Sequence, residues 1–305
     1  MASTISPRET HPGDLLIRPA TERDLPRLWE IRAATEAADP LNPPPAGAPS
    51  AVLGHLVRSA TLLLAERDGQ IVGFGGRADR SGVAFLTDLF VDPALQSTAV
   101  GKSLLRELFQ GAGAQRFTLA STDPRAVALY TRAGMTPRWP NFDLVADSAQ
   151  MELPKGRSIT LRPADPRDPE FLDWDYEVGK RRRPQDLAFF RDKQEASCFW
   201  TDSGGDTVGY AVVRRDSVGG TRDDTLMIGP VGGRSAAAAR AATLAAVAWA
   251  KERAPRLEIT VPGPHPALRT LLESGFRIEY IGTYCASASV QINPGRYIAS
   301  GEDLF

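Results

Sequence analysis

The chain has 305 residues, of which 42% are hydrophobic and 24% are charged. These values are those of an ordinary globular protein, and they exclude a wholly disordered, collagen-like or coiled-coil chain. At ~150 residues per domain, the length predicts two domains. The 36 Lys and Arg against 37 Asp and Glu give a net charge of −1. Because no overall field draws such a molecule to nucleic acid or to an anionic membrane, we expect neither as a partner.

Cysteine content and segment hydropathy bear on location. Cys198 and Cys285 cannot form a disulfide framework, which favours a reducing, cytoplasmic compartment. The most apolar run, residues 236–250, is mostly alanine and is too short to span a bilayer. Residues 1–14 lack the pattern of a signal peptide, so we predict a disordered tail. The three histidines lack ligand spacing, and we expect no metal.

Apolar runs and turn signals predict a mixed α/β first half. In chain order, the expected elements are a strand at 15–18, a helix at 24–37, strands at 62–66, 71–77 and 83–91, a helix at 97–110 and a strand at 116–120. The proline-rich stretch at 42–47 cannot be regular structure. Asp68-Gly69 predicts a hairpin turn. Asp123, the proline after it and Gly134 predict the start and end of a further helix.

The sharpest chemical signal lies at residues 89–103. A strand ends at Val91, a turn of small residues follows, and a helix begins. Small residues let backbone amides approach a bulky anion closely, and a helix N-terminus adds exposed N–H donors. The segment therefore predicts a pyrophosphate cradle, with a plain strand-to-helix turn as the alternative.

The second half of the chain repeats the first. The segment Ile-Arg-Pro-Ala at 17–20 recurs as Leu-Arg-Pro-Ala at 161–164, and Val-Gly-Phe at 72–74 recurs as Val-Gly-Tyr at 208–210. Matches that keep their order predict a duplicated domain. The predicted organisation is a disordered tail at 1–14, a first domain at 15–147, a linker at 148–158 and a second, degenerate domain at 159–305.

Two motifs of the first half resemble those of the GNAT N-acetyltransferase superfamily. The first motif is Gln or Arg, two residues, Gly, one residue, and Gly or Ala, which here falls on Gln96, Ala99 and Gly101. The second motif is Asn-x-x-Ala-x-x-Leu-Tyr-x-x-x-Gly-Phe, and its positions here are Asp123, Ala126, Leu129, Tyr130, Gly134 and Met135. The chain departs from the family at Ala99, which replaces a glycine, and at Asp123, which replaces asparagine.

The resemblance implies an α/β (α+β) fold of two tandem GNAT-type domains, each a mixed, mainly antiparallel twisted sheet flanked by helices. It implies that acetyl-CoA lies between the fourth and fifth strands, with backbone groups of Phe90 and Val91 at the thioester. The other cofactor-binding residues that it implies are Gln96, Ser97, Thr98, Ala99, Val100, Gly101, Lys102, Ser103, Asp123 and Ala126. The acceptor would be a small-molecule amine that attacks the thioester directly.

Two residues are candidates for catalysis. Tyr130 stands where a phenol could protonate the departing thiolate, and a tyrosine packed in the core is the alternative. Relatives often carry a Glu at the position of Thr87. Asp88 is the nearest carboxylate and the candidate base, although strand alternation predicts that it faces away from Thr87. A base acting through water remains open, as does Glu36 in the first helix.

The second copy lacks the chemical features of the first. Arg234 falls on the spacing of the cradle, but no glycine stands at the positions of close approach, and Leu271 takes the place of the tyrosine. We therefore expect a tandem N-acetyltransferase that is active in its first domain. The alternatives are a non-catalytic protein that binds acyl-CoA and a tandem enzyme that is active in its second domain.

Overall fold

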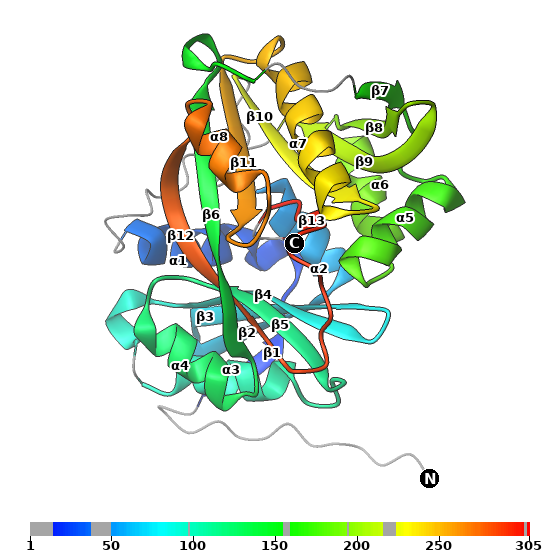
Figure 1. Cartoon of the computed structure of the whole chain (residues 1–305). Coiled ribbons are helices and arrows are strands. Elements are labelled where there is room, and N and C mark those ends of the chain that lie inside the picture. The colour runs from blue at the N-terminus through cyan, green and yellow to red at the C-terminus, as the bar shows by residue number, and fades with distance from the viewer. Residues whose placement is uncertain are drawn as a thin grey trace.

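The computed structural model describes residues 15–37, 50–96, 98–154, 159–193, 195–215, 224–301 and 304–305. The predicted tail and the proline-rich stretch lie outside these residues, as does part of the predicted linker. Figure 1 shows two lobes, the lower one built mainly from the first half of the chain and the upper one mainly from the second half.

The first half contains the predicted strands and helices, together with one helix and one strand that were not predicted. Its helices are α1 (Leu25–Ala37), α2 (Ala51–Ser59), α3 (Val100–Leu108) and α4 (Pro124–Arg132). Its strands are β1 (Leu16–Pro19), β2 (Thr61–Arg67), β3 (Gln70–Arg80), β4 (Val83–Val91), β5 (Gln115–Ala120) and β6 (Thr136–Asp147). The helix α2 and the strand β6 have no counterpart among the expected elements.

The second half repeats this order of elements. Its helices are α5 (Pro169–Gly179), α6 (Pro184–Lys193), α7 (Ala236–Lys251) and α8 (Leu268–Glu273). Its strands are β7 (Thr160–Pro163), β8 (Ser197–Ser203), β9 (Asp206–Arg214), β10 (Thr225–Gly233), β11 (Arg256–Pro262), β12 (Arg277–Ala286) and β13 (Tyr297–Ile298). The alanine-rich run forms α7, and no helix in the part of the chain that the structure describes is long and apolar enough to cross a membrane.

The described strands form one mixed, largely antiparallel sheet, as the expected fold class requires. Its order is β1-β2-β3-β4-β5-β12-β6-β11-β10-β9-β8-β7, and β13 pairs with β10. The pairing of β4 with β5 is parallel, and so is that of β10 with β11, while the other pairs are antiparallel. The two halves therefore share one pattern of strand pairing.

The two halves exchange a strand at the centre of the sheet. β12 of the second half pairs with β5, from Thr283 opposite Ala120 to Ala286 opposite Phe117. β6 of the first half pairs with the whole length of β11, through residues Asn141 to Asp147. β6 and β12 also pair with each other. Figure 1 shows these two long strands running between the lobes. Each half is thus completed by a strand of the other, which the repeat in the sequence does not predict.

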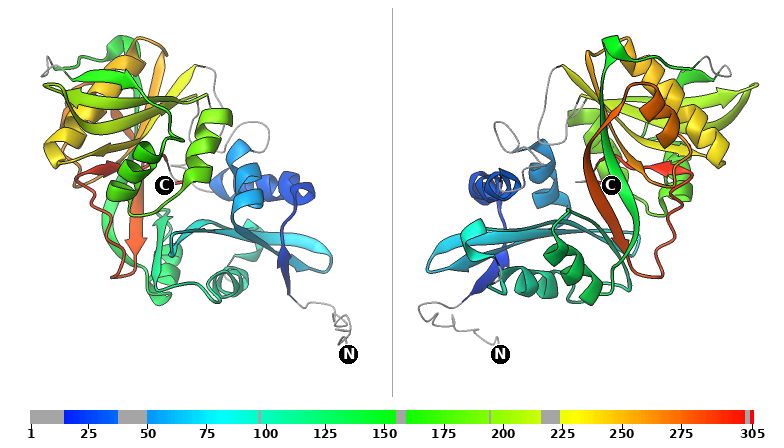
Figure 2. Two further views of the ribbon diagram at one scale, coloured as in Figure 1. Left: turned by 90° about the vertical axis from the view of Figure 1, so that its right-hand side faces the viewer. Right: turned by 60° about the vertical axis from the view of Figure 1, so that its left-hand side comes forward.

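Helices cover both faces of the first half of the sheet. On one face, α3 and α4 pack through Leu105, Leu108 and Tyr130. On the other, Leu28 of α1 and Leu53 of α2 join a buried cluster that continues into α5 and α6. In Figure 2, α1 and α2 lie on the side of their sheet that faces the other lobe. α1 packs against β3 and β4 in this core.

Local signals place the turns correctly. Asp68 and Gly69 have φ values of 51° and 75°, as a two-residue hairpin with a primed turn requires. Asp123 caps α4 by accepting the N–H of Arg125, and Gly134 follows the helix with φ of 86°. The helix predicted at 97–110 begins later, at Val100.

Candidate functional site

A cavity of about 730 Å³ opens where β4 and β5 separate. The two strands pair from Val83 opposite Gln115 to Leu86 opposite Thr118, and no pair beyond these is formed between them. Crevices at the carboxyl ends of parallel strands are common ligand sites. The predicted residues that line the cavity are Asp88, Phe90, Val91, Gln96, Ala99, Gly101, Lys102, Asp123, Ala126 and Tyr130.

A β-bulge at Thr87 changes the direction of the β4 side chains. In the pairing with β3, Asp88 lies opposite Gly76 and Leu86 lies opposite Arg77, so Thr87 has no partner. The expectation that Asp88 faces away from Thr87 is therefore wrong, because the bulge interrupts the alternation. Both side chains line the cavity, and the Thr87 hydroxyl donates to Asp88 Oδ2 at 2.7 Å.

Gly76 provides the space for this bulge. A Cβ atom at this position would collide with Thr87 Oγ1, and it would lie 3.1 Å from Asp88 Oδ2. A side chain at this position would therefore push the bulged segment out of place.

Three buried charged side chains meet at the end of the cavity formed by α1. Arg32 Nε donates to Glu36 Oε1 at 2.8 Å, and Arg32 Nη1 lies 4.0 Å from Asp88 Oδ1. The guanidinium of Arg32 also lies 5.6 Å from the centre of the Phe90 ring. The two carboxylates proposed as alternative bases thus lie in one site, joined by one arginine.

The predicted cradle falls on the turn between β4 and α3, and only some of its residues line the cavity. Ser97 lies outside the described residues. Thr98, Val100 and Ser103 do not line the cavity, and the Val100 side chain is buried in a cluster with Leu104. Ala99 has φ of 68°, a left-handed conformation that suits the glycine found at this place in the GNAT motif.

The start of α4 faces this turn across the cavity. Asp123 Oδ1 accepts the backbone N–H of Arg125 at 2.8 Å, and Arg125 Nη2 donates to Asp123 Oδ2 at 2.7 Å. The same guanidinium donates to Gln96 Oε1 at 2.9 Å. The hydrogen bonds that Arg125 donates to Asp123 lower the pKa of the Asp123 carboxyl below its ordinary value.

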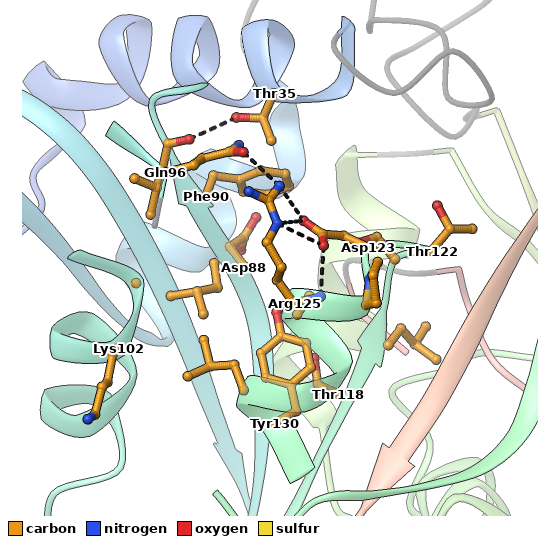
Figure 3. A pocket seen from close by; sticks show the side chains of 18 of the residues that line it. Thr35, Asp88, Phe90, Gln96, Lys102, Thr118, Thr122, Asp123, Arg125 and Tyr130 are labelled. Carbon is orange, nitrogen blue, oxygen red and sulfur yellow. Dashed lines mark hydrogen bonds and ion pairs between the residues drawn. The ribbon is translucent and has the colours of Figure 1, made fainter. Parts of the chain in front are cut away.

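Tyr130 lies on α4 with its ring buried and its hydroxyl pointing into the cavity (Figure 3). Burial raises its pKa above the ordinary value, and charges at Cys285, Asp88 and Asp123 add to the effect. The phenol therefore keeps its proton at neutral pH. Among the residues that the structure describes, none forms a hydrogen bond with this hydroxyl.

Other residues of the cavity escaped the sequence analysis. Arg32 could have been found from its spacing of four residues to Glu36 on one helix. Arg125 sits beside a predicted residue, but only the fold turns it toward Gln96. Tyr280 belongs to β12, and its hydroxyl accepts the N–H of Thr122 at 3.1 Å. No local signal points to Tyr280, because it reaches the cavity through the strand exchange.

Comparisons with solved structures identify the fold. A protein from Pyrococcus horikoshii described as a candidate acetyltransferase superposes with a TM-score of 0.72 at 16% identity, covering 99% of both chains. A GCN5-related N-acetyltransferase from Sphaerobacter thermophilus has a TM-score of 0.59 at 16% identity, over 90% of this chain and 95% of the other. A tandem GNAT protein of the clavulanic acid pathway has a TM-score of 0.56 at 16% identity, over 92% and 100%.

Sequence comparison places the family in the first half of the chain. No protein with a curated description matches the chain by sequence. The model of the acetyltransferase (GNAT) family matches residues 26–135, a range that includes the cavity residues from Arg32 to Tyr130. The structural relatives have the same fold over both halves. The sequence likeness to the acetyltransferase (GNAT) family therefore covers residues 26–135 of this chain.

Proposed function

We propose that the protein is a tandem N-acetyltransferase that moves an acetyl group from acetyl-CoA to a primary amine, with its active site in the first half. One observation carries this proposal. The cavity between β4 and β5 brings together the edge of β4 at Phe90 and Val91 that β5 does not pair with, the start of α3, and the protonated phenol of Tyr130. These are the groups that a thioester, a diphosphate and a departing thiolate need.

The donor would lie along the gap between the two strands. Backbone groups of Phe90 and Val91 would hold the thioester end by hydrogen bonds, since that edge of β4 is not used by β5. The backbone amides from Gln96 to Lys102 would hold the diphosphate, because the first turn of a helix has N–H groups without intrahelical partners.

The reaction would proceed by direct attack. The neutral amine nitrogen bonds to the thioester carbonyl carbon, the C–S bond breaks, and the sulfur leaves as a thiolate that takes the proton of Tyr130. Asp88 would accept the proton that the amine loses. Its carboxylate is buried and is held by the Thr87 hydroxyl. Glu36, which Arg32 holds in the same site as Asp88, would be the alternative base.

In the described part of the second half, a strand lies at the place equivalent to the gap between β4 and β5. β10 pairs with β11 only over its first residues, from Thr225 to Met227. In the same way, β4 pairs with β5 only from Val83 to Leu86. Beyond this point β13 pairs with β10, with Ile298 opposite Val231 and Tyr297 opposite Gly232. The chain's own strand thus occupies the edge that we assign to the donor in the first half. This supports donor binding in the first half.

A thiol-release assay on a panel of primary amines with acetyl-CoA tests the proposal. We expect release with at least one amine, and we expect Tyr130→Phe to lower kcat about 10² to 10⁴-fold while the Kd for acetyl-CoA stays unchanged. The variant keeps the ring and loses only the proton donor. Tyr176→Phe, which changes an exposed tyrosine of α5, is the matched control.

Two outcomes would count against the proposal. Tight acetyl-CoA binding without transfer to any amine would favour the non-catalytic alternative. Unchanged turnover in Tyr130→Phe with a reactive amine would remove this residue from the mechanism.

A further inference from the structure

The carboxylate of Asp123 raises a problem for anion binding. Asp123 lines the proposed donor cavity, where the GNAT motif has an uncharged asparagine. Its lowered pKa keeps the carboxylate charged at neutral pH. A negative charge beside an incoming diphosphate opposes binding, unless a cation compensates it.

Arg125 provides that cation in a fixed geometry. Its Nε donates to Asp123 Oδ1 at 3.0 Å and its Nη2 donates to Asp123 Oδ2 at 2.7 Å, so both carboxylate oxygens are engaged. Paired contacts of this kind fix the plane of the guanidinium as well as its position.

The same guanidinium bridges the opening of the cavity. Arg125 follows β5, whereas Gln96 follows β4, and the hydrogen bond from Nη2 to Gln96 Oε1 joins the two sides at 2.9 Å. Figure 3 shows the Arg125 side chain crossing the space between Asp123 and Gln96. The side chain is 60% exposed, so a solute can reach it from outside.

We propose that Arg125 is a donor-binding residue, whose guanidinium, held by Asp123, exchanges the Gln96 carbonyl for a phosphate oxygen of acyl-CoA. This inference rests on the proposed function, because it takes the cavity as the donor site. A phosphate oxygen is a stronger acceptor than a neutral amide, which favours the exchange. The Asp123–Arg125 pair then serves as the counterpart of the asparagine in the motif.

The second half contains a matched control. Arg167 is clamped by Asp165 with the same three contacts, from its N–H, Nε and Nη2, at 2.9, 2.9 and 2.8 Å. This pair does not line the cavity. Arg167→Ala therefore removes the same local structure without touching the proposed donor site.

The experiment measures the Kd of coenzyme A and the turnover of acetyl-CoA and acetylpantetheine, which lacks the diphosphate. We expect Arg125→Ala to raise the Kd of coenzyme A about ten-fold or more, as for one charge-assisted hydrogen bond lost beside an uncompensated carboxylate. Arg167→Ala should keep the wild-type Kd, and Arg125→Ala should lower kcat/KM less with acetylpantetheine than with acetyl-CoA.

Two more variants separate the effect of the Arg125 charge on affinity from the effect of its hydrogen bonds. In the Arg125→Ala background, Asp123→Asn should recover part of the lost affinity, because it removes the repulsion without restoring the hydrogen bond. Arg125→Lys should give an intermediate Kd, since it keeps a cation and loses the paired geometry.

Equal Kd values for Arg125→Ala and the wild type would overturn the inference. So would a loss of activity in Arg125→Ala that is as large with acetylpantetheine as with acetyl-CoA. Failure of the wild type to bind coenzyme A would instead overturn the proposed function.

Discussion

Ala99 holds a conformation that suits glycine better than alanine. Its φ of 68° places the Cβ atom close to the backbone, which costs an L-residue ~1–2 kcal/mol. The residues around it keep the turn in place, because Val100 and Leu104 are fully buried beneath it. The chain therefore keeps the backbone path of the glycine-containing turn while it carries an extra methyl group.

Replacing this alanine with glycine should stabilise the protein. We expect Ala99→Gly to raise the free energy of unfolding by up to about 1 kcal/mol, because relief of the left-handed strain exceeds the greater freedom of glycine in the unfolded chain. Urea unfolding measures this free energy, and we expect its slope against urea concentration to stay unchanged. Ala133→Gly is the control: Ala133 has φ of −84°, so glycine should destabilise there. A loss of stability in both variants would contradict this account.

At the scale of elements, β12 contributes to a cavity that belongs otherwise to the first half. Tyr280 reaches the turn before α4, where its hydroxyl accepts the N–H of Thr122. Thr122 directly precedes Asp123, the N-cap of α4. The strand from the second half thus positions the helix that carries Tyr130.

Removal of this hydroxyl should affect catalysis more than stability. We expect Tyr280→Phe to lower kcat/KM about 3- to 10-fold, the effect of one hydrogen bond of ~1 kcal/mol that orients a catalytic helix. Steady-state kinetics with acetyl-CoA measures the change. We expect that no amine restores the wild-type rate. Kinetics equal to those of the wild type would show that the turn holds its place without Tyr280.

The strand β13 sets the number of donor sites. We expect calorimetric titration to find one coenzyme A per chain, because β13 occupies the edge of β10 in the second half. Lys102→Glu, which places a negative charge at the α3 turn, should abolish this binding, whereas Arg234→Glu in the second half should leave it intact. Two molecules bound per chain, or loss of binding only in Arg234→Glu, would contradict the assignment.

The elements that sequence reasoning predicted correctly are those specified by nearby residues. The turn at Asp68 and the cap at Asp123 each depend on a few consecutive positions. The bulge at Thr87 depends instead on the facing Gly76, and Tyr280 depends on a strand from the other half. Long-range pairing of this kind leaves no pattern within a single segment.

At the scale of the whole molecule, one buried ion cluster ties the halves together. Asp186 of α6 accepts hydrogen bonds from Arg80 Nε and Nη2 of β3, both at 2.8 Å, and its Oδ1 lies 2.8 Å from His55 Nε2 of α2. His55 also stacks on Phe189 with ring centres 4.5 Å apart. With the shared apolar core and the exchanged strands, this cluster predicts that both halves unfold in one transition.

Asp186→Asn should weaken the whole molecule. The substitution removes the charge that balances the buried Arg80 guanidinium, and breaking a buried ion pair costs ~3–5 kcal/mol. We expect a loss of about 3 kcal/mol in urea unfolding, because Arg80 keeps its hydrogen bond to the Ser59 carbonyl. Asp173→Asn removes an exposed ion pair with Arg182 and should cost ~0–1 kcal/mol.

The pH dependence gives an independent check on this cluster. The hydrogen bonds from Arg80 and His55 outweigh burial and lower the pKa of Asp186 from 3.8 to about 2. An acid with a lowered folded-state pKa contributes stability above its unfolded pKa and loses it as the pH falls through the folded value. Between pH 4 and 2, the wild type should therefore lose about 2 kcal/mol that Asp186→Asn does not lose. Because the cluster joins α2, β3 and α6, parallel pH profiles for the two proteins would mean that the Asp186 carboxylate does not hold the halves together.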